Sequence, residues 1–260
     1  MFVTNSGVSI HYEVEGDGPP VMLHTGAGGD LRIWRDAGYV SGLTGFRKIL
    51  IDQRGRGLSD RPSTVESHRM EWFVSDVRAV LDDVGVESTG FFGYSNGAIV
   101  GVAFGSAHPE RLKALVGIGS LPFLNFTDLP KPADPEAEIK RMVAAGGVKV
   151  DVAGFMERDK DRFPEGIEKN VLEGDPLMYA LDDITWNEWR GPLDVYSTLR
   201  APVLIVAGER EDLKRQTEKS IARLSEGRLV RIPGIGHLSA FYRSDLILPH
   251  VLPFLNEKLR

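Results

Sequence analysis

Short apolar runs recur along the chain and alternate with segments that have helical periodicity. Near-continuous apolar runs of this kind are typical of strands buried on both faces, as in a parallel sheet. They predict strands at Val21–Leu23, Lys48–Asp52, Gly90–Gly93, Leu115–Ile118, Val203–Ala207 and Leu229–Ile232. Val8–Val14 instead alternates apolar and polar side chains, which predicts an edge strand.

Helical spacing appears between these runs. Apolar residues from Met70 to Val84 recur at that spacing and predict an amphipathic helix. Asn96–Ala107, which stops before Pro109, and Thr217–Leu224 predict further helices. Strands that alternate with helices indicate an α/β fold built on a mostly parallel, doubly wound sheet.

The stretch from residue 121 to residue 192 breaks this rhythm. It contains many aromatic, proline and acidic residues but no pattern of a buried strand. We therefore predict a helical cap, or lid, at residues 121–192, inserted into a core formed by residues 1–120 and 193–260.

The composition limits the possible classes of function. Hydrophobic residues make up 42% of the chain and charged residues 26%, as in an ordinary globular protein. A net charge of −6 with dispersed basic residues argues against nucleic-acid and anionic-membrane partners. The absence of cysteine excludes disulfides and thiolate chemistry. The first residues show no secretory signal, and no apolar run approaches the ~20 residues that cross a bilayer, so we expect a cytoplasmic protein.

Gly93-Tyr94-Ser95-Asn96-Gly97 fits the pattern G-x-S-x-G and lies between a predicted strand and a predicted helix. A turn this sharp strains its central residue, and the flanking glycines remove side chains that would collide. The turn lifts the Ser95 hydroxyl above the sheet edge, where the helix N-terminus favours negative charge. A capping serine in a glycine-rich turn is the alternative, but the strand and helix on either side favour Ser95 as a nucleophile.

The order of the strands and this strand-to-helix turn, the nucleophile elbow, resemble the α/β-hydrolase superfamily. The resemblance extends over nearly the whole chain. The resemblance implies a Ser–acid–His triad with backbone N–H groups that bind an oxyanion. Asp52–Asp60 resembles the family's D-x-R-G-x-G-x-S loop, for which we expect a structural role. Relatives that act as dehalogenases or epoxide hydrolases place aspartate where Ser95 stands, which disfavours that chemistry.

The loop His24–Asp30 follows the strand Val21–Leu23 and, by this resemblance, supplies one oxyanion donor. By position that donor is the N–H of Gly26, and the second is the N–H of Asn96, directly after the nucleophile. The chain has Thr25 where the family often has glycine. The loop lacks the patterns of phosphate-binding loops, and His24 itself is expected to be structural.

The general base is expected after the last strand. The glycine-rich turn Pro233–His237 carries the only histidine so placed. Because an unperturbed imidazole titrates at about pH 6.5, it can take the Ser95 proton and return it to a leaving group. Chain order in the family therefore predicts His237 as the base.

The acid is expected after the strand Val203–Ala207, where the chain reads Gly208-Glu209-Arg210-Glu211-Asp212. In the family the acid commonly stands three residues after that glycine, which favours Glu211, although aspartate is commoner there. A shift of the loop by one residue would present Asp212 instead. The acid holds the imidazole tautomer and stabilises the imidazolium.

Apolar side chains of the cap imply a largely apolar pocket over Ser95. They are Phe123, Leu124, Phe126, Phe155, Met156, Phe163, Met178, Tyr179, Trp186 and Trp189. Trp34 lies a few residues beyond the oxyanion loop and is predicted to contact the substrate.

These residues predict a serine hydrolase that acts on a small to medium apolar ester or lactone through an acyl-enzyme, without cofactor or metal. Its partner is a small-molecule substrate, and the oligomeric state stays open. One alternative is hydrolysis of a carbon–carbon bond in a diketone-like ring-cleavage product, whose carboxylate Arg158, Arg162 or Arg190 would bind. A slow-turnover ligand receptor and a metal-free haloperoxidase side activity would use the same triad.

Overall fold

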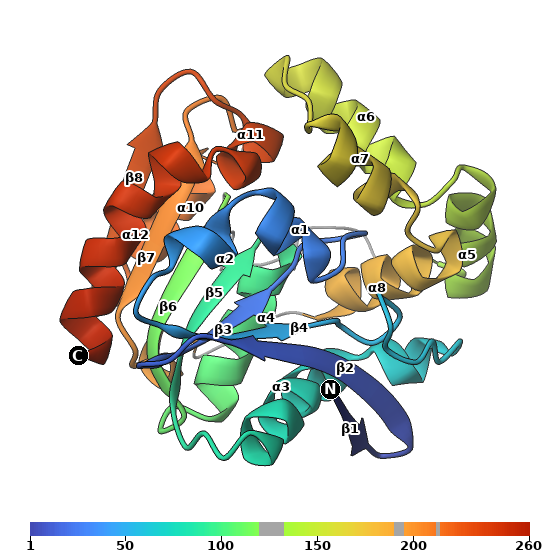
Figure 1. Ribbon diagram of the computed structural model, residues 1–260. Coiled ribbons are helices and arrows are strands. Elements are labelled where there is room, and N and C mark those ends of the chain that lie inside the picture. Colours follow the sequence, from blue (N-terminus) through green and yellow to red (C-terminus); the bar gives the residue numbers. More distant parts are fainter. Residues whose placement is uncertain (120–132, 190–194, 212–213) are drawn as a thin grey trace.

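The computed structural model describes residues 1–119, 133–189, 195–211 and 214–260. At its centre is an eight-stranded sheet with the order β1-β2-β4-β3-β5-β6-β7-β8 (Figure 1). The strands are β1 (Phe2–Asn5), β2 (Val8–Glu15), β3 (Pro20–His24), β4 (Arg47–Ile51), β5 (Thr89–Tyr94), β6 (Leu112–Ile118), β7 (Val203–Gly208) and β8 (Gly227–Ile232). Pairing is antiparallel from β1 to β4 and parallel from β4 to β8.

This arrangement confirms the mostly parallel α/β sheet. It also corrects one expectation, because β2 is not the edge of the sheet. The edge strand is β1, which pairs antiparallel with β2. Its four residues are too few to give a recognisable strand pattern in the sequence.

Helices cover both faces of the sheet. One buried cluster joins it to α3 (Met70–Asp83), α4 (Asn96–Ala107) and α10 (Lys214–Ile221). A second cluster joins its other face to α1 (Arg32–Asp36), α2 (Tyr39–Gly42), α11 (His237–Tyr242) and α12 (Ser244–Leu259). A 3-10 turn at Val65–His68 precedes α3, and α9 (Val195–Thr198) precedes β7.

The apolar runs of the strands are explained by these two clusters. Side chains alternate across a strand, so a strand covered on both faces needs apolar residues at successive positions. Phe91 enters the cluster with α3 and α4, whereas its neighbour Phe92 enters the cluster with α11 and α12.

Between β6 and β7 lie the helices α5 (Pro135–Ala144), α6 (Val148–Asp159), α7 (Glu165–Leu172) and α8 (Pro176–Glu188). Figure 1 shows them gathered to one side of the sheet. Their helical structure agrees with the predicted cap. The expected limits at residues 121 and 192 fall outside the described residues, so the division into two parts stays a prediction.

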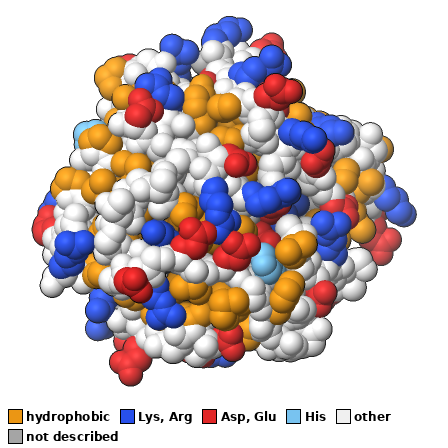
Figure 2. Space-filling model, in the orientation of Figure 1, with side chains coloured by type: hydrophobic (Ala, Val, Ile, Leu, Met, Phe, Trp, Pro, Cys, Tyr) orange, Lys and Arg blue, Asp and Glu red, His pale blue; other side chains and the backbone are white. Residues whose placement is uncertain are grey.

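Acidic and basic side chains are interspersed over the face of the molecule that Figure 2 shows. Among the described residues, no helix combines the length and the apolar character that a membrane crossing requires.

Candidate active site

Ser95 stands at the junction of β5 and α4 with φ of 50° and ψ of −121°. A positive φ is strained for a residue with a Cβ. The glycines of the motif are needed for steric reasons: a Cβ on Gly93 would lie 2.4 Å from the Ala98 nitrogen, and one on Gly97 would lie 2.2 Å from the His24 oxygen. The motif therefore has the strained strand-to-helix turn that its pattern predicted.

The residues predicted as base and acid lie beside this serine. His237 Nε2 is 3.1 Å from Ser95 Oγ, and His237 Nδ1 is 3.0 Å from Glu211 Oε2. The second oxygen of Glu211 accepts the Gly208 N–H at 2.6 Å, which fixes the carboxylate. An acceptor at Nδ1 favours the tautomer with a proton there, so Nε2 presents its lone pair to the serine.

Burial strengthens this arrangement electrostatically. His237 is 7% exposed and Glu211 is 3% exposed, so water screens their interaction little. The structure brings together Ser95, His237 and Glu211, the three residues named from the sequence. Asp212, the alternative acid, lies outside the described residues.

Two backbone segments flank the serine where an oxyanion would form. Asn96 is the first residue of α4, and N–H groups of a first helical turn have no partner within the helix. A Cβ on Gly26 would lie 3.1 Å from the Ser95 Cβ, so the loop after β3 runs directly against the serine. Both predicted donors are near Ser95, and their role in binding an oxyanion stays a prediction.

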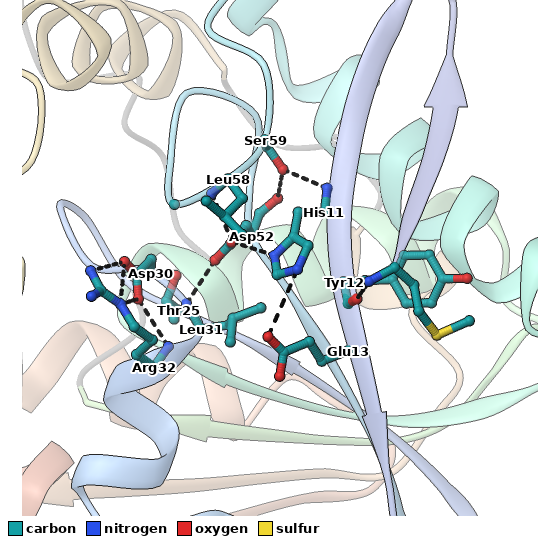
Figure 3. A network of polar contacts seen from close by, with 12 residues as sticks. His11, Tyr12, Glu13, Thr25, Asp30, Leu31, Arg32, Asp52, Leu58 and Ser59 are labelled. Atoms are coloured by element: carbon teal, nitrogen blue, oxygen red, sulfur yellow. Dashed lines mark hydrogen bonds and ion pairs between the residues drawn. The ribbon is translucent and has the colours of Figure 1, made fainter.

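Asp52 connects Leu31, the residue directly after the loop His24–Asp30, to other parts of the core. Its Oδ1 accepts the Leu31 N–H at 2.8 Å, and its Oδ2 accepts the Leu58 N–H at 3.0 Å and contacts His11 Nδ1 at 2.7 Å (Figure 3). Burial raises the pKa of Asp52. These contacts support the structural role expected for this loop. Among the described side chains, including these, no group of three or more histidines and carboxylates is arranged to hold a metal ion.

His24 is the last residue of β3, at the start of the loop His24–Asp30, and is almost fully buried. Burial lowers its pKa to about 4, so the ring is neutral near pH 7. Its Nδ1 lies 3.1 Å from the Thr25 carbonyl oxygen, to which the neutral ring can donate. The residue therefore has the structural environment that we expected.

Trp34 is not brought to the site. Its side chain has no accessible surface and packs against the rings of Tyr39, Phe92 and Phe241, with centroid distances of 5.2 Å each. A side chain without accessible surface does not line a cavity, so the expected contact with substrate is absent from this structure. The sequence placed Trp34 near the loop but could not show that α1 turns the indole into the core.

The cap reaches the site on two sides. On one side, a Cβ on Gly28 of the oxyanion loop would lie 3.0 Å from Val148 Cγ2 of α6. On the other side, the Phe155 ring of α6 stacks on His237 with centroids 4.5 Å apart and an interplanar angle of 19°. The sequence indicates Phe155 only as one of ten apolar cap residues, because nothing in its spacing shows that its ring contacts His237.

Other cap residues named from the sequence have different environments. Phe163, Met178 and Tyr179 are buried in the packing. Arg162 pairs with Glu168 at 3.5 Å and has a 69% exposed side chain. Phe123, Leu124, Phe126 and Arg190, and the side chains of Arg158 and Trp186, lie outside the described residues.

Comparisons with known proteins agree with this fold. A family model described as the alpha/beta hydrolase fold matches residues 19–244. The chain belongs to this family. A thermophilic esterase from Thermogutta terrifontis has a similar structure, with a TM-score of 0.79 and 22% identity over 100% of this chain and 99% of that one. The enol-lactonase from Burkholderia xenovorans LB400 gives a TM-score of 0.77 and 21% identity over 98% of this chain and 100% of that one.

Among relatives in this family, Epoxide hydrolase B of Mycobacterium tuberculosis is 35% identical over 121 residues, which are 46% of this chain and 34% of that protein. The chain spans only about a third of the length of the first curated relatives that it matches. The comparisons support a hydrolase, and the reaction must be argued from the site.

Proposed function

We propose that the protein is a serine hydrolase in which Ser95 Oγ attacks the carbonyl carbon of its substrate. His237 Nε2 takes the hydroxyl proton as the new bond forms, and the N–H groups of Gly26 and Asn96 bind the oxyanion. His237 then returns the proton to the leaving alcohol oxygen, which releases it and leaves an acyl-enzyme. Water, activated by the same imidazole, attacks this ester and frees Ser95.

One observation carries the proposal: the continuous series of contacts from Ser95 Oγ through His237 to Glu211, on a serine with strained backbone. In such a series the carboxylate stabilises the imidazolium that forms when the serine loses its proton. Each end is fixed separately, since Gly208 binds Glu211 and the elbow holds Ser95.

The substrate proposed is a small to medium apolar ester or lactone. An apolar ring, Phe155, borders the base from the cap side, and Val148 and Val152 of the same helix are buried. The similar structures include an esterase and an enol-lactonase, in line with carbonyl substrates.

Epoxide opening fits Ser95 poorly, although relatives include proteins named as epoxide hydrolases. A carboxylate that opens an epoxide forms an ester, which water can cleave at its carbonyl carbon. A serine would form an ether, which has no carbonyl carbon, so the enzyme would stay alkylated. We therefore propose acyl transfer.

The test is covalent labelling with a fluorophosphonate, followed by intact mass and by peptide mapping. An activated serine reacts with this probe whatever its natural substrate. We expect one adduct on Ser95, its loss in Ser95→Ala and His237→Ala, and its retention in His108→Ala, a histidine at the end of α4.

Failure of Ser95 to react at high probe concentration, with His237 intact, would contradict the proposal. The ligand-receptor reading would then take its place. If labelling succeeds, comparison of simple esters and lactones with a carboxylated diketone would separate ester hydrolysis from carbon–carbon bond hydrolysis.

A further inference from the structure

The imidazole of His237 lies between two aromatic rings that come from different parts of the chain. The Tyr94 ring, from the core, stacks on it with centroids 5.3 Å apart and an interplanar angle of 30°. The Phe155 ring, from the cap, stacks with centroids 4.5 Å apart at 19°. The edge of the imidazole contacts Ser95 and Glu211, so both its faces and both its nitrogens have partners.

A second contact holds the cap against the helix that carries the base. Asp161, in the link between α6 and α7, accepts the Ser239 N–H at 2.5 Å and the Tyr242 hydroxyl at 3.2 Å. Both donors belong to α11, which begins at His237. Burial and the neighbouring Asp161 carboxylate raise the pKa of Tyr242, so its hydroxyl keeps the proton that it donates.

We propose that Phe155 is a positioning residue that acts through His237: its ring holds the imidazole in line with Ser95 and stabilises the imidazolium formed during the reaction. The inference rests on the proposed function of His237 as a base. The face of an aromatic ring carries partial negative charge and attracts a cation within about 6 Å of its centroid. A seated cap thus supplies part of the base's environment.

Two effects of Phe155 oppose each other. The bulk of the Phe155 side chain keeps water from the imidazole, and this desolvation disfavours the charged imidazolium. The π-face of the phenyl ring attracts the imidazolium and so favours it. Leucine at this position keeps apolar bulk without a π-face, and tyrosine keeps both. Phe155 is half-buried, so we expect either change to need little repacking. Among the described residues, the charged or titratable side chains Glu211, Tyr94, Asp161 and Tyr242 contact His237 or its helix, and neither variant changes them.

The experiment measures the second-order rate of Ser95 labelling by a fluorophosphonate from pH 5 to pH 9 in the wild type, Phe155→Leu and Phe155→Tyr. We expect the midpoint of the rise with pH to fall by roughly half a unit to one unit in Phe155→Leu. The rate above the midpoint should fall roughly threefold to tenfold, because a weaker base removes the proton less readily. Phe155→Tyr should restore both values.

A midpoint in Phe155→Leu equal to or above that of the wild type would overturn the inference, even if the rate fell, because an opened cap that admits water favours the charged ring and cannot lower the midpoint. Phe155→Met replaces Phe155→Leu if that variant unfolds below the assay temperature. The His237 ring proton, followed by NMR over the same range, gives the midpoint without any labelling. If Ser95 is unreactive in the wild type, the proposed function fails, and the NMR midpoints still decide whether Phe155 stabilises the charged ring.

Discussion

Buried histidines contact carboxylates at several places in this protein, and the pairs look alike at the first nitrogen. The Nδ1 atoms lie 3.0, 2.7 and 2.6 Å from their partners in the pairs His237–Glu211, His11–Asp52 and His68–Asp182. All three histidines are at most 7% exposed. A carboxylate beside a buried histidine therefore does not distinguish a base from a structural residue.

The second nitrogen makes the distinction. In His237 it faces the Ser95 hydroxyl at 3.1 Å, whereas in His68 it faces the Pro62 carbonyl oxygen at 2.7 Å. In His11 it lies 3.7 Å from a Glu13 carboxylate oxygen. A carbonyl or carboxylate oxygen offers no proton, so of these three only His237 can act as a base toward a neighbour.

The largest expected effect is on the rate of Ser95 labelling, and it tests the contrast between His237 and His11. We expect His237→Ala to lower the rate of Ser95 labelling by about 10⁴-fold or more, because it removes the proton acceptor. His11→Ala removes a carboxylate contact of 2.7 Å elsewhere, against 3.0 Å for His237, and should change the rate per folded molecule by less than about threefold. Similar losses in both variants would show that the pairs are equivalent.

Glu211→Gln should lower the labelling rate by about 10³-fold, since the amide no longer stabilises the imidazolium and can favour the wrong tautomer. Glu209→Gln makes the same change two residues earlier, on an exposed side chain, and serves as the matched control. Asp212→Asn tests the alternative acid. A greater loss in Asp212→Asn than in Glu211→Gln would move the acid to residue 212.

The positions of these three residues could be predicted because they depend on local order along the chain. Ser95 follows a buried strand in a motif with two sterically required glycines, and His237 and Glu211 follow the last two strands. Parallel strands direct their carboxyl ends to one edge of the sheet, so residues far apart in sequence meet there. Strand pattern and elbow therefore sufficed for most of the core.

Contacts that depend on how separate segments pack could not be predicted. Asp52 meets His11 because β2 and β4 pair antiparallel with a particular register. Phe155 meets His237 only because of how the cap helix α6 lies on α11. The indole of Trp34 points into the aromatic core although its position in sequence favoured the site. Each case depends on tertiary geometry that composition and periodicity do not encode.

A structural pair should show its effect in stability. Asp182 of α8 accepts hydrogen bonds from Gln53 and Arg56 of the core at 3.0 and 2.6 Å, and contacts His68. We expect Asp182→Asn to lower the free energy of unfolding by about 3 kcal/mol, because a buried guanidinium loses its charged partner. Urea denaturation measures this. Asp245→Asn, at an exposed pair with Arg243, should give no measurable change.

The smallest expected effect is the contribution of His24 to the pH dependence of stability. Among the described residues, this buried histidine contacts the Thr25 carbonyl oxygen, and the structure shows no carboxylate contact for it. Burial lowers its pKa to about 4, whereas an unfolded histidine titrates at about 6.5. Between these values the unfolded chain binds the proton and the folded chain does not, so acid favours unfolding. His24 should therefore lower the free energy of unfolding by on the order of 2 kcal/mol on going from pH 8 to pH 5.

His24→Asn keeps a donor near the Thr25 oxygen and removes the titrating group. Its unfolding free energy, measured by urea denaturation at pH 8, 6 and 5, should fall less steeply below pH 6.5 than that of the wild type. The difference between the two slopes should correspond to the uptake of up to one proton on unfolding. Above pH 6.5 both forms of the histidine are neutral, so the two curves should run parallel. Equal slopes below pH 6.5 would mean that the ring accepts a proton while folded. A buried histidine could then carry charge without a carboxylate contact. Among the buried histidines His11, His24, His68 and His237, the contact with the Ser95 hydroxyl would then be the one feature that sets His237 apart.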